Sequence, residues 1–429
     1  MGDRFHPISM EQLTDWVFDE LETKEAIFGV PRAAFFVPDP ADRFKVDVYG
    51  RTLETPFGVA AGPHTQMAQN IVVSWLLGAR LIELKTIQTL DELEIAKPCI
   101  DVEDEGYNVE WSQELKVFES FDEYLRAWVL VHALHAKLGF PGTSPGVIFN
   151  MSVGYNLEGI KEPNVQWYLD TMRDASAYLD EYVEIVAQRF PEVRSLAIPA
   201  TVSDTMTLST MHGCPPEEIE QITLYLLQER KLHTSVKCNP TLLGPDRVRG
   251  IINDDLGFVD VPIPDEAFGH DLKYVDAVPM VHNLRRVAAA EGLQFGLKLS
   301  NTLEVENWRS TFDAEGMMYL SGRALHPVTV NLAAMLSEEF RGDVMLSYAG
   351  GADCFNVTEL LAAGMTTVTV CSDLLKSGGY LRLSQYTENL AAAIIEAGAE
   401  DLADLSARRA VGVNGFAEFA PVLHWSALT

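Results

Sequence analysis

The sequence predicts an α/β fold, specifically a (β/α)8 TIM barrel, and three observations point to it. Eight short runs rich in apolar residues recur along most of the 429-residue chain. Helical patterns lie between these runs, and such repeated alternation is typical of a parallel barrel. Each run also ends in residues able to bind a ligand, as the strands of a barrel do at the active-site rim.

The first fifty residues are predicted to form an accessory segment, followed by the barrel at 51–400 and a C-terminal tail at 401–429. Ser9 and Gln12 form a capping-box pattern at the start of an amphipathic helix that runs to about Glu22. The N-terminus has no basic stretch before an apolar run, and no window is apolar enough to span a membrane. We therefore expect a cytoplasmic protein without membrane insertion.

The eight apolar runs are interpreted as buried parallel strands, most of them apolar on both faces. Their positions are Phe57–Ala61, Arg80–Thr86, Gly146–Ser152, Thr205–Thr210, Ser235–Asn239, Phe295–Asn301, Val344–Gly351 and Thr366–Ser372.

Helices are predicted between the strands, because the intervening segments carry the start and stop signals of helices. A further segment, rich in Asp, Pro and Gly, is predicted to be an insertion between strands five and six that lies over the barrel mouth. The insertion is Asn253–Pro279, and the helices are Gln66–Leu77, Asp122–Leu138, Val165–Phe190, Pro215–Leu232 and Asn356–Ala363.

Composition excludes several classes of function. The chain has 32 basic and 62 acidic residues and a formal net charge of −30, so it repels phosphate backbones, and nucleic acid is excluded as a main partner. The five cysteines form no CxxC pair, which excludes an iron–sulfur cluster or zinc ribbon of the usual spacing. His132 and His135 stand three apart on a predicted helix, but structural histidines are commoner than ligands, and we expect no metal.

The strand ends indicate an anionic ligand. Lys85, Lys237 and Lys298 stand inside otherwise apolar strands, where an ammonium group needs a partner. The loops predicted after strands seven and eight contain Gly350, Gly351, Cys371 and Ser372, and these two loops form the usual phosphate site of a barrel. We expect a Cβ at Gly351 to push the phosphate away from its backbone donors.

An ordered set of motifs resembles a known family. The motifs are similar to the FMN-binding barrels of dihydroorotate dehydrogenases and, more closely, of dihydropyrimidine dehydrogenase. Over nearly its full length the chain resembles the N-terminal region of the YgfK-like, or putative selenate reductase subunit, family. The motifs are TPFGVAAGPHTQ (55–66), LIELKTIQ (81–88), FNMSVGYN (149–156), MTLSTMHGCPPEEIE (206–220), VKCNPTLL (236–243), LSNT (299–302), YLSGRALHP (319–327), SYAGGAD (347–353) and VCSD (370–373).

The resemblance implies FMN as the cofactor and assigns its contacts. The residues implied to line the flavin ring and its ribityl edge are Ala60, Ala61, Gly62, Lys85, Thr86 and Lys237. The residues implied to hold the phosphate are Gly322, Gly350, Gly351, Cys371 and Ser372.

The resemblance also implies a substrate site. Asn156, Asn301 and Thr302 match positions that hold the amide groups of the base in pyrimidine-reducing relatives. Thr207 stands where those enzymes have a further asparagine, and a hydroxyl cannot offer the paired donor and acceptor of an amide. This departure disfavours uracil or thymine as the substrate.

Two placements of the catalytic residue are open, because the loop after strand four is shorter than in the relatives. Aligned on the strand, Thr210 falls near a catalytic cysteine; aligned on the helix, Cys214 falls at the proton-donating cysteine. We favour Cys214, because Pro215 and Pro216 anchor it at a helix start. His212 could form a nucleophilic pair with Cys214, but reduction of a polarised double bond needs an acid.

We therefore expect an FMN-dependent oxidoreductase that exchanges hydride between flavin and a planar, amide-containing heterocycle of purine or pyrimidine type. In longer family members iron–sulfur and FAD/NAD(P)H modules follow the barrel, so this chain is either a truncated form or a stand-alone subunit. Electrons would then come from a separate iron–sulfur/FAD partner, and a homo-oligomer is compatible with the sequence. The alternatives are a non-catalytic electron-relay or assembly subunit, and a flavin-free barrel lyase acting on a phosphorylated substrate.

Overall fold

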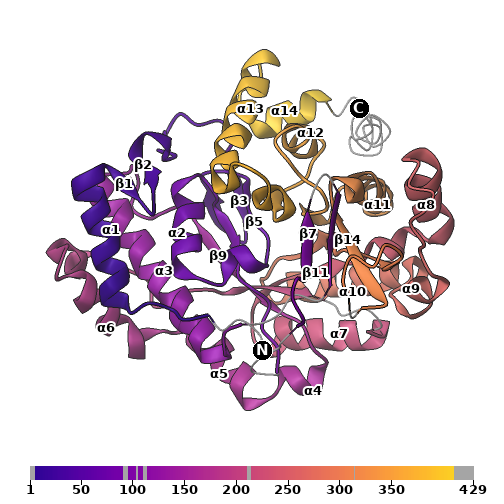
Figure 1. Cartoon of the computed structure of the whole chain (residues 1–429), viewed down its shortest axis with the longest axis horizontal. Coiled ribbons are helices and arrows are strands. Elements are labelled where there is room, and N and C mark those ends of the chain that lie inside the picture. Colours follow the sequence, from indigo (N-terminus) through magenta and orange to yellow (C-terminus); the bar gives the residue numbers. More distant parts are fainter. Residues whose placement is uncertain are drawn as a thin grey trace.

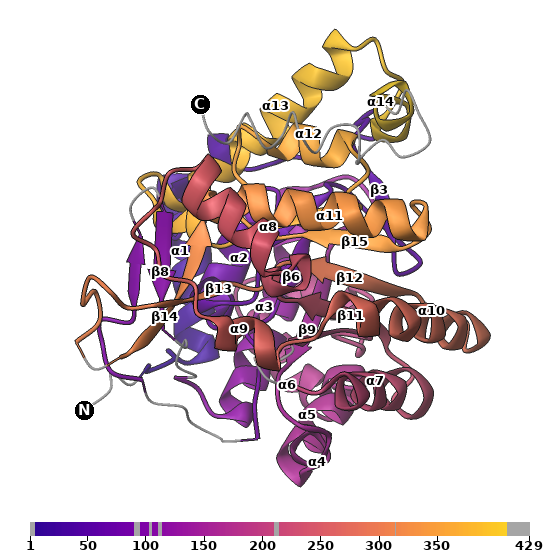
Figure 2. The same cartoon turned by 90° about the vertical axis from the view of Figure 1, so that its right-hand side faces the viewer.

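The computed structural model describes residues 5–89, 95–102, 105–109, 114–209, 214–313 and 315–409. Within these residues, eight parallel strands close into a barrel surrounded by helices (Figures 1 and 2). Strands that follow one another in the barrel also neighbour one another, and the last pairs with the first, so the TIM-barrel prediction is confirmed. The strands are β5 (Phe57–Val59), β6 (Leu81–Glu83), β9 (Ile148–Val153), β10 (Thr205–Ser209), β11 (His233–Cys238), β12 (Phe295–Leu299), β15 (Met345–Tyr348) and β16 (Thr367–Val370).

Helices cover the outside of this barrel (Figure 1). Their apolar faces pack on the outward side chains of the strands and form one large buried cluster. The helices are α2 (Ala68–Leu76), α3 (Val117–Leu138), α4 (Leu157–Ile160), α5 (Pro163–Arg173), α6 (Ser176–Val186), α7 (Pro216–Leu224), α8 (Pro245–Arg249), α9 (Asp265–His270), α10 (Tyr274–Ala290), α11 (His326–Phe340), α12 (Val357–Ala362), α13 (Leu383–Glu396) and α14 (Leu402–Arg409). No helix in the described ranges is long and apolar enough to cross a membrane.

The N-terminal helix α1 (Met10–Lys24) forms with the predicted capping box. Ser9 Oγ accepts from the Gln12 backbone N–H, and Gln12 Oε1 accepts from the Ser9 backbone N–H, both at 3.3 Å. The helix lies beside α6 (Figure 1). Phe18 also stacks on Phe190, which follows α6, with ring centroids 6.3 Å apart. The accessory segment is thus fastened to the outside of the barrel.

Two small hairpins complete this N-terminal segment, β1 (Ala26–Ile27) with β2 (Val30–Pro31) and β3 (Val46–Val48) with β4 (Arg51–Leu53). The β3–β4 hairpin packs on the residues that begin β6 and β9. The Tyr49 hydroxyl also lies 2.7 Å from Ser235 Oγ on β11. The hairpin therefore closes the end of the barrel opposite to the strand C-termini.

The single long helix predicted over Val165–Phe190 is wrong, because the chain breaks into α5 and α6 at Asp174 and Ala175. Asp174 adopts an extended conformation, and its carboxylate accepts from the Ser176 backbone N–H at 3.1 Å. An Asp side chain competes in this way for backbone donors, which favours a break and a new helix start. The Ala175 N–H donates instead to the Ala200 carbonyl.

A four-stranded antiparallel sheet that the sequence did not predict lies at the barrel mouth. Its order is β13 (Leu303–Glu306), β14 (Met317–Gly322), β8 (Glu105–Asn108) and β7 (Ile100–Val102). The predicted insertion Asn253–Pro279 joins its edge, where the Glu306 N–H donates to the Pro262 carbonyl at 3.1 Å. The insertion is shorter than predicted, because its last residues, from Tyr274 onward, form the start of α10.

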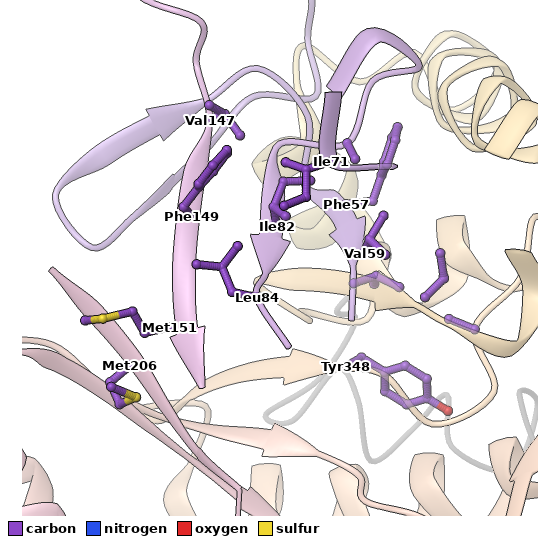
Figure 3. Packing of buried hydrophobic residues seen from close by; sticks show 14 of the residues in the cluster. Phe57, Val59, Ile71, Ile82, Leu84, Val147, Phe149, Met151, Met206 and Tyr348 are labelled. Carbon is purple, nitrogen blue, oxygen red and sulfur yellow. The ribbon is translucent and has the colours of Figure 1, made fainter. Parts of the chain in front are cut away.

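The interior of the barrel is polar, which corrects the prediction that most strands are apolar on both faces. Ile82 and Leu84, like Phe149 and Met151, belong to the buried apolar cluster (Figure 3). Because neighbouring strand residues point to opposite faces, Glu83, between Ile82 and Leu84, and Asn150, between Phe149 and Met151, face the barrel interior. These inward residues are buried and hydrogen-bonded: Asn150 Nδ2 donates to Thr207 Oγ1 at 2.7 Å, for example.

Candidate active site

A cavity of about 300 Å³ lies at the C-terminal ends of the barrel strands. One part of its wall comes from the strand ends and the loops that follow them. Another part comes from the mouth sheet, with Asn108 on β8 and Tyr319 and Ser321 on β14. This is the face on which barrel enzymes carry their active sites.

Most of the predicted cofactor and substrate residues meet at this cavity. Gly62 and Gly350 are not part of its described lining, although both lie in loops next to residues that are. The predicted residues that line it are Ala60, Ala61, Lys85, Thr86, Lys237, Asn301, Thr302, Gly322, Gly351, Cys371 and Ser372.

The structure does not bring Asn156 and Thr207 to the cavity wall. Asn156 Oδ1 accepts from the Gly159 backbone N–H at 2.8 Å, so this side chain caps α4. Thr207 is buried in the barrel interior, where its hydroxyl accepts from Asn150. Both side chains therefore make contacts that a purely structural residue would make.

Of the three candidate catalytic residues, Thr210 and His212 lie outside the described residues. Cys214 is half-buried just before α7 and is not part of the described cavity lining. Burial, and to a lesser extent the Glu218 carboxylate, raise the pKa of the Cys214 thiol to about 11. The thiol is therefore protonated at neutral pH, as a proton donor must be.

Lys298, one of the three lysines inside the strands, has the partner that its position required. Lys298 Nζ lies 2.5 Å from Glu83 Oε1 and also hydrogen-bonds Thr369. Lys85 and Lys237 line the cavity. Burial lowers the pKa of Lys237 to about 8, and the negative charge of Glu83 partly opposes this decrease. The described lining contains these two lysines and no Asp or Glu. A cationic cavity in a chain of net charge −30 favours an anionic ligand.

A smaller cavity of about 20 Å³ adjoins the first at the loops after β15 and β16. The two share Gly322, Ala349, Gly351, Cys371 and Ser372, and Arg323 and Lys376 add positive charge to the smaller one. Asp353 and Asp373 also line it, paired with Arg323 at 3.2 Å and Arg382 at 2.7 Å respectively.

Gly351 has a φ of +82°, a conformation that L side chains rarely adopt. A Cβ there would lie 2.4 Å from the Gly322 carbonyl oxygen. The expectation that a Cβ would act mainly on the bound phosphate is therefore corrected, because it meets the protein's own backbone first.

Cys371 forms a neutral pair with His64 at the edge of the main cavity. Its Sγ lies 3.8 Å from His64 Nδ1. Burial raises the pKa of Cys371 to about 12 and lowers the pKa of His64 to about 4. This pair therefore lacks the thiolate and imidazolium of a cysteine nucleophile.

Sequence reasoning assigned no role to nine residues that line the cavity, namely Gln88, Asn108, Gly154, Ser209, Ser300, Tyr319, Ser321, Leu325 and Ala349. Asn108 stands out among them because its Oδ1 is buried without a hydrogen-bond partner among the described residues. Its Nδ2 donates to the Val109 carbonyl at 2.7 Å, which fixes the orientation of the amide. Its strand is only four residues long, so no periodic pattern could have indicated it.

The fold of the described residues is an α/β barrel similar to that of dihydroorotate dehydrogenase (DHODH). A crystal structure of ligand-free DHODH from Eimeria tenella matches with a TM-score of 0.56 and 16% identity, covering 92% of this chain and 98% of that one. The complex of Eimeria tenella DHODH with ferulenol matches with a TM-score of 0.56 and 15% identity, covering 96% and 98%.

Residues 28–412 match the family described as "Oxidoreductase YgfK, N-terminal TIM-barrel domain", and the chain belongs to this family. It is 46% identical over 403 residues to the "Putative oxidoreductase YgfK" of Escherichia coli (strain K12), and equally to that of Escherichia coli O157:H7. The match covers 90% of this chain and 39% of each relative. The chain thus spans about two fifths of the length of these relatives, and the resemblance inferred from the motifs is confirmed.

Proposed function

We propose that this chain is the FMN-binding barrel of an oxidoreductase and exchanges hydride with a planar, amide-containing heterocycle of purine or pyrimidine type. The observation that carries the proposal is the cationic cavity at the strand ends, joined to a glycine-lined pocket at the loops after β15 and β16. Electrons would pass to or from a separate iron–sulfur/FAD partner, which the described chain does not supply.

The described residues fit FMN. Gly322 and Gly351 both have positive φ and open the wall between the two cavities, where a Cβ on Gly351 would crowd the backbone. Backbone N–H groups of these loops, with Ser372 and Lys376, would hold the phosphate. Lys85 and Lys237 would face the more polar edge of the ring, where positive charge favours an electron-rich cofactor. When bound, FMN supplies the hydride chemistry.

The remaining polar groups suit a substrate with amides. Asn301 and Thr302 line the cavity from the loop after β12, and Asn108 faces it from the mouth sheet. The buried Asn108 Oδ1 lacks a partner among the described residues and would accept from a ring N–H of the substrate. Cys214 lies outside the described cavity lining, and its role as proton donor rests on the resemblance. Its thiol is protonated at neutral pH and would give a proton to the atom next to the one reduced.

A non-catalytic electron-relay subunit is a second candidate. The observation that favours it concerns two of the candidate substrate residues. Asn156 and Thr207, the latter in place of the relatives' asparagine, are engaged in structural hydrogen bonds away from the cavity. Such a subunit would keep the flavin and lose the substrate contacts.

The purified protein is expected to be yellow and to release FMN, not FAD, on heating. The test is its visible spectrum and chromatography of the released cofactor, before and after incubation with added FMN. A double variant K85M/K237M serves as the matched control and should bind much less FMN. A colourless wild type that takes up no FMN would contradict the proposal and favour the flavin-free lyase. FMN binding without oxidation of the reduced flavin by any of a panel of oxidised purines and pyrimidines would favour the relay.

A further inference from the structure

An ion pair crosses the interior of the barrel below the cavity. Glu83 on β6 and Lys298 on β12 come from strands on opposite sides of the closed sheet. Their side chains are only 4% and 2% exposed, and Glu83 Oε1 lies 2.5 Å from Lys298 Nζ. Thr369 on β16 accepts from Lys298 and donates to Glu83 Oε2 at 3.4 Å.

Stability alone is a poor reason for such a pair. Removing two charges from water costs free energy that their attraction often fails to recover, and apolar residues of similar size are frequently as stabilising. Several other inward residues of this barrel are neutral Ser, Thr and Asn side chains that hydrogen-bond one another, as in the pairs Asn150–Thr207 and Thr367–Ser347. We therefore looked for an electrostatic effect of this ion pair on the neighbouring residues.

The pair is connected to the cavity through two contacts. Ala61, which lines the cavity, donates its backbone N–H to Glu83 Oε2 at 3.4 Å. Lys298 is the register partner of Lys237 on the neighbouring strand β11. Residues paired in this way lie on the same face of the sheet, with strands about 4.8 Å apart. Lys237 and Lys298 thus project from neighbouring positions on the same face of the sheet, and Glu83 pairs with Lys298 across the barrel.

We propose that Glu83 and Lys298 are positioning residues that set the charge of Lys237, the cavity lysine next to them. The proposal rests on the proposed function for its consequence, because the charge of Lys237 would decide how strongly the cavity holds an anionic cofactor. The charge itself is a property of this chain and is measurable without any cofactor.

The directions follow from the titratable groups whose charges act on the pKa of Lys237. Among the described residues these include Glu83, Lys298, Cys371 and Lys85. Burial lowers the pKa of Lys237 to about 8; Glu83 works against this shift and Lys298 adds to it. Loss of the Glu83 charge should therefore lower the pKa of Lys237 further, and loss of the Lys298 charge should raise it.

The experiment measures the pKa of Lys237 by competitive acetylation. The full chain is treated with trace acetic anhydride across a pH series, and mass spectrometry follows the peptide that carries Lys237. In wild type the labelling should rise with a midpoint near pH 8. A change of about one pKa unit in each direction would make E83Q label about fivefold faster at pH 7 and K298M about tenfold more slowly, because the neutral amine is the form that reacts. The exposed Lys24 in the same digests is the internal control and should not change.

The double variant E83Q/K298M covers the case in which a single variant does not fold, because it leaves no buried charge unpaired. Its midpoint should fall below that of wild type, since Glu83 affects Lys237 more than Lys298 does. Equal midpoints in wild type and every folded variant would overturn the inference and leave the pair a purely structural one.

FMN binding is measured in parallel on the same proteins, so that the two proposals fail separately. If the acetylation midpoint of Lys237 shifts in the variants but no protein binds FMN, the inference is supported and the proposed function is contradicted. FMN binding with unshifted midpoints would retain the proposed function and overturn the inference.

Discussion

Lys237 changes its charge close to physiological pH, because burial in the cavity wall lowers its pKa to about 8. Below this pH the ammonium form is present and attracts an anion; above it the neutral amine does not. The chain as a whole is strongly acidic, with a net charge of −30. An anion is therefore attracted only where basic side chains such as Lys237 line the cavity itself.

Binding of FMN is accordingly expected to weaken by about tenfold as pH rises from 7 to 9, the size of one charged hydrogen bond. K237M should bind more weakly at pH 7 and lose this part of the pH dependence. Fluorescence titration of apoprotein with FMN at several pH values measures both effects, and K24M on the surface is the control. Identical affinity in wild type at both pH values would contradict the assignment.

Cys214 is kept protonated by burial and by Glu218, with a pKa of about 11. C214S should therefore keep its flavin spectrum but lose about 10²–10⁴-fold in the rate at which substrate reoxidises reduced flavin, the usual size of a general-acid effect. Stopped-flow absorbance measures this rate. C99S, another half-buried cysteine, is the control. A rate in C214S within a few-fold of wild type would transfer the proton-donor role to Thr210, His212 or a water.

At the scale of elements, the loop after β15 depends on backbone conformation as much as on side chains. Tyr348 at the end of β15 donates its hydroxyl to the Gly350 carbonyl at 2.7 Å, and His326 Nδ1 lies 2.6 Å from the same hydroxyl. Gly351 then turns the chain at positive φ against the Gly322 carbonyl. The loop is thus held by two buried side chains, Tyr348 and His326.

G351A is expected to destabilise the protein more than G342A. The comparison separates the steric clash of the added Cβ from the backbone strain that both variants share. Both glycines have positive φ, +82° and +73°, so each alanine costs about 1 kcal/mol of backbone strain. Nothing lies within 4 Å of a Cβ at Gly342, whereas the Gly322 oxygen lies 2.4 Å from one at Gly351. Overpacking should add about 1–3 kcal/mol to the loss in G351A. Urea unfolding measures the difference in the free energy of unfolding. Equal losses in the two variants would show that the loop shifts to accommodate the Cβ without cost.

At the scale of the whole molecule, the described residues form a barrel with a polar interior, a closed bottom and a mouth covered by a second sheet. Within these residues, no three His, Cys, Asp or Glu side chains gather in a way that would hold a metal ion. The chain matches 39% of the length of its curated relatives. We therefore propose, on the basis of the longer family members, that the barrel acts together with electron-transfer modules.

The chain alone is expected to oxidise NADH or NADPH slowly and to accept electrons readily from dithionite or a low-potential dye. The reason is that the sequence carries no GxGxxG dinucleotide loop. Absorbance at the flavin and nicotinamide bands under anaerobic conditions follows both reactions, with free FMN as the control. Rapid, saturable NADPH oxidation would reveal a nicotinamide site that we have not identified.

Much of the architecture could be predicted because its signals are local. Strand runs, the Ser9–Gln12 capping box and the glycine that ends α3 at Gly139 depend on residues within a few positions of one another. The order of the strands then follows from the right-handed, sequential winding of barrels. Most cavity residues were found in the same way, since they stand at the ends of those strands or in the loops that follow.

Only the tertiary structure decided which polar residues meet. The mouth sheet pairs β8 with β14, strands of four and six residues separated by about half of the chain, and so brought Asn108 to the cavity. The same holds for Glu83 and Lys298, which the sequence shows as two unrelated charges and the closed barrel places 2.5 Å apart. Local patterns determine elements because helix and strand periods are short-range, whereas charge pairing across a barrel depends on register and closure, which no local pattern encodes.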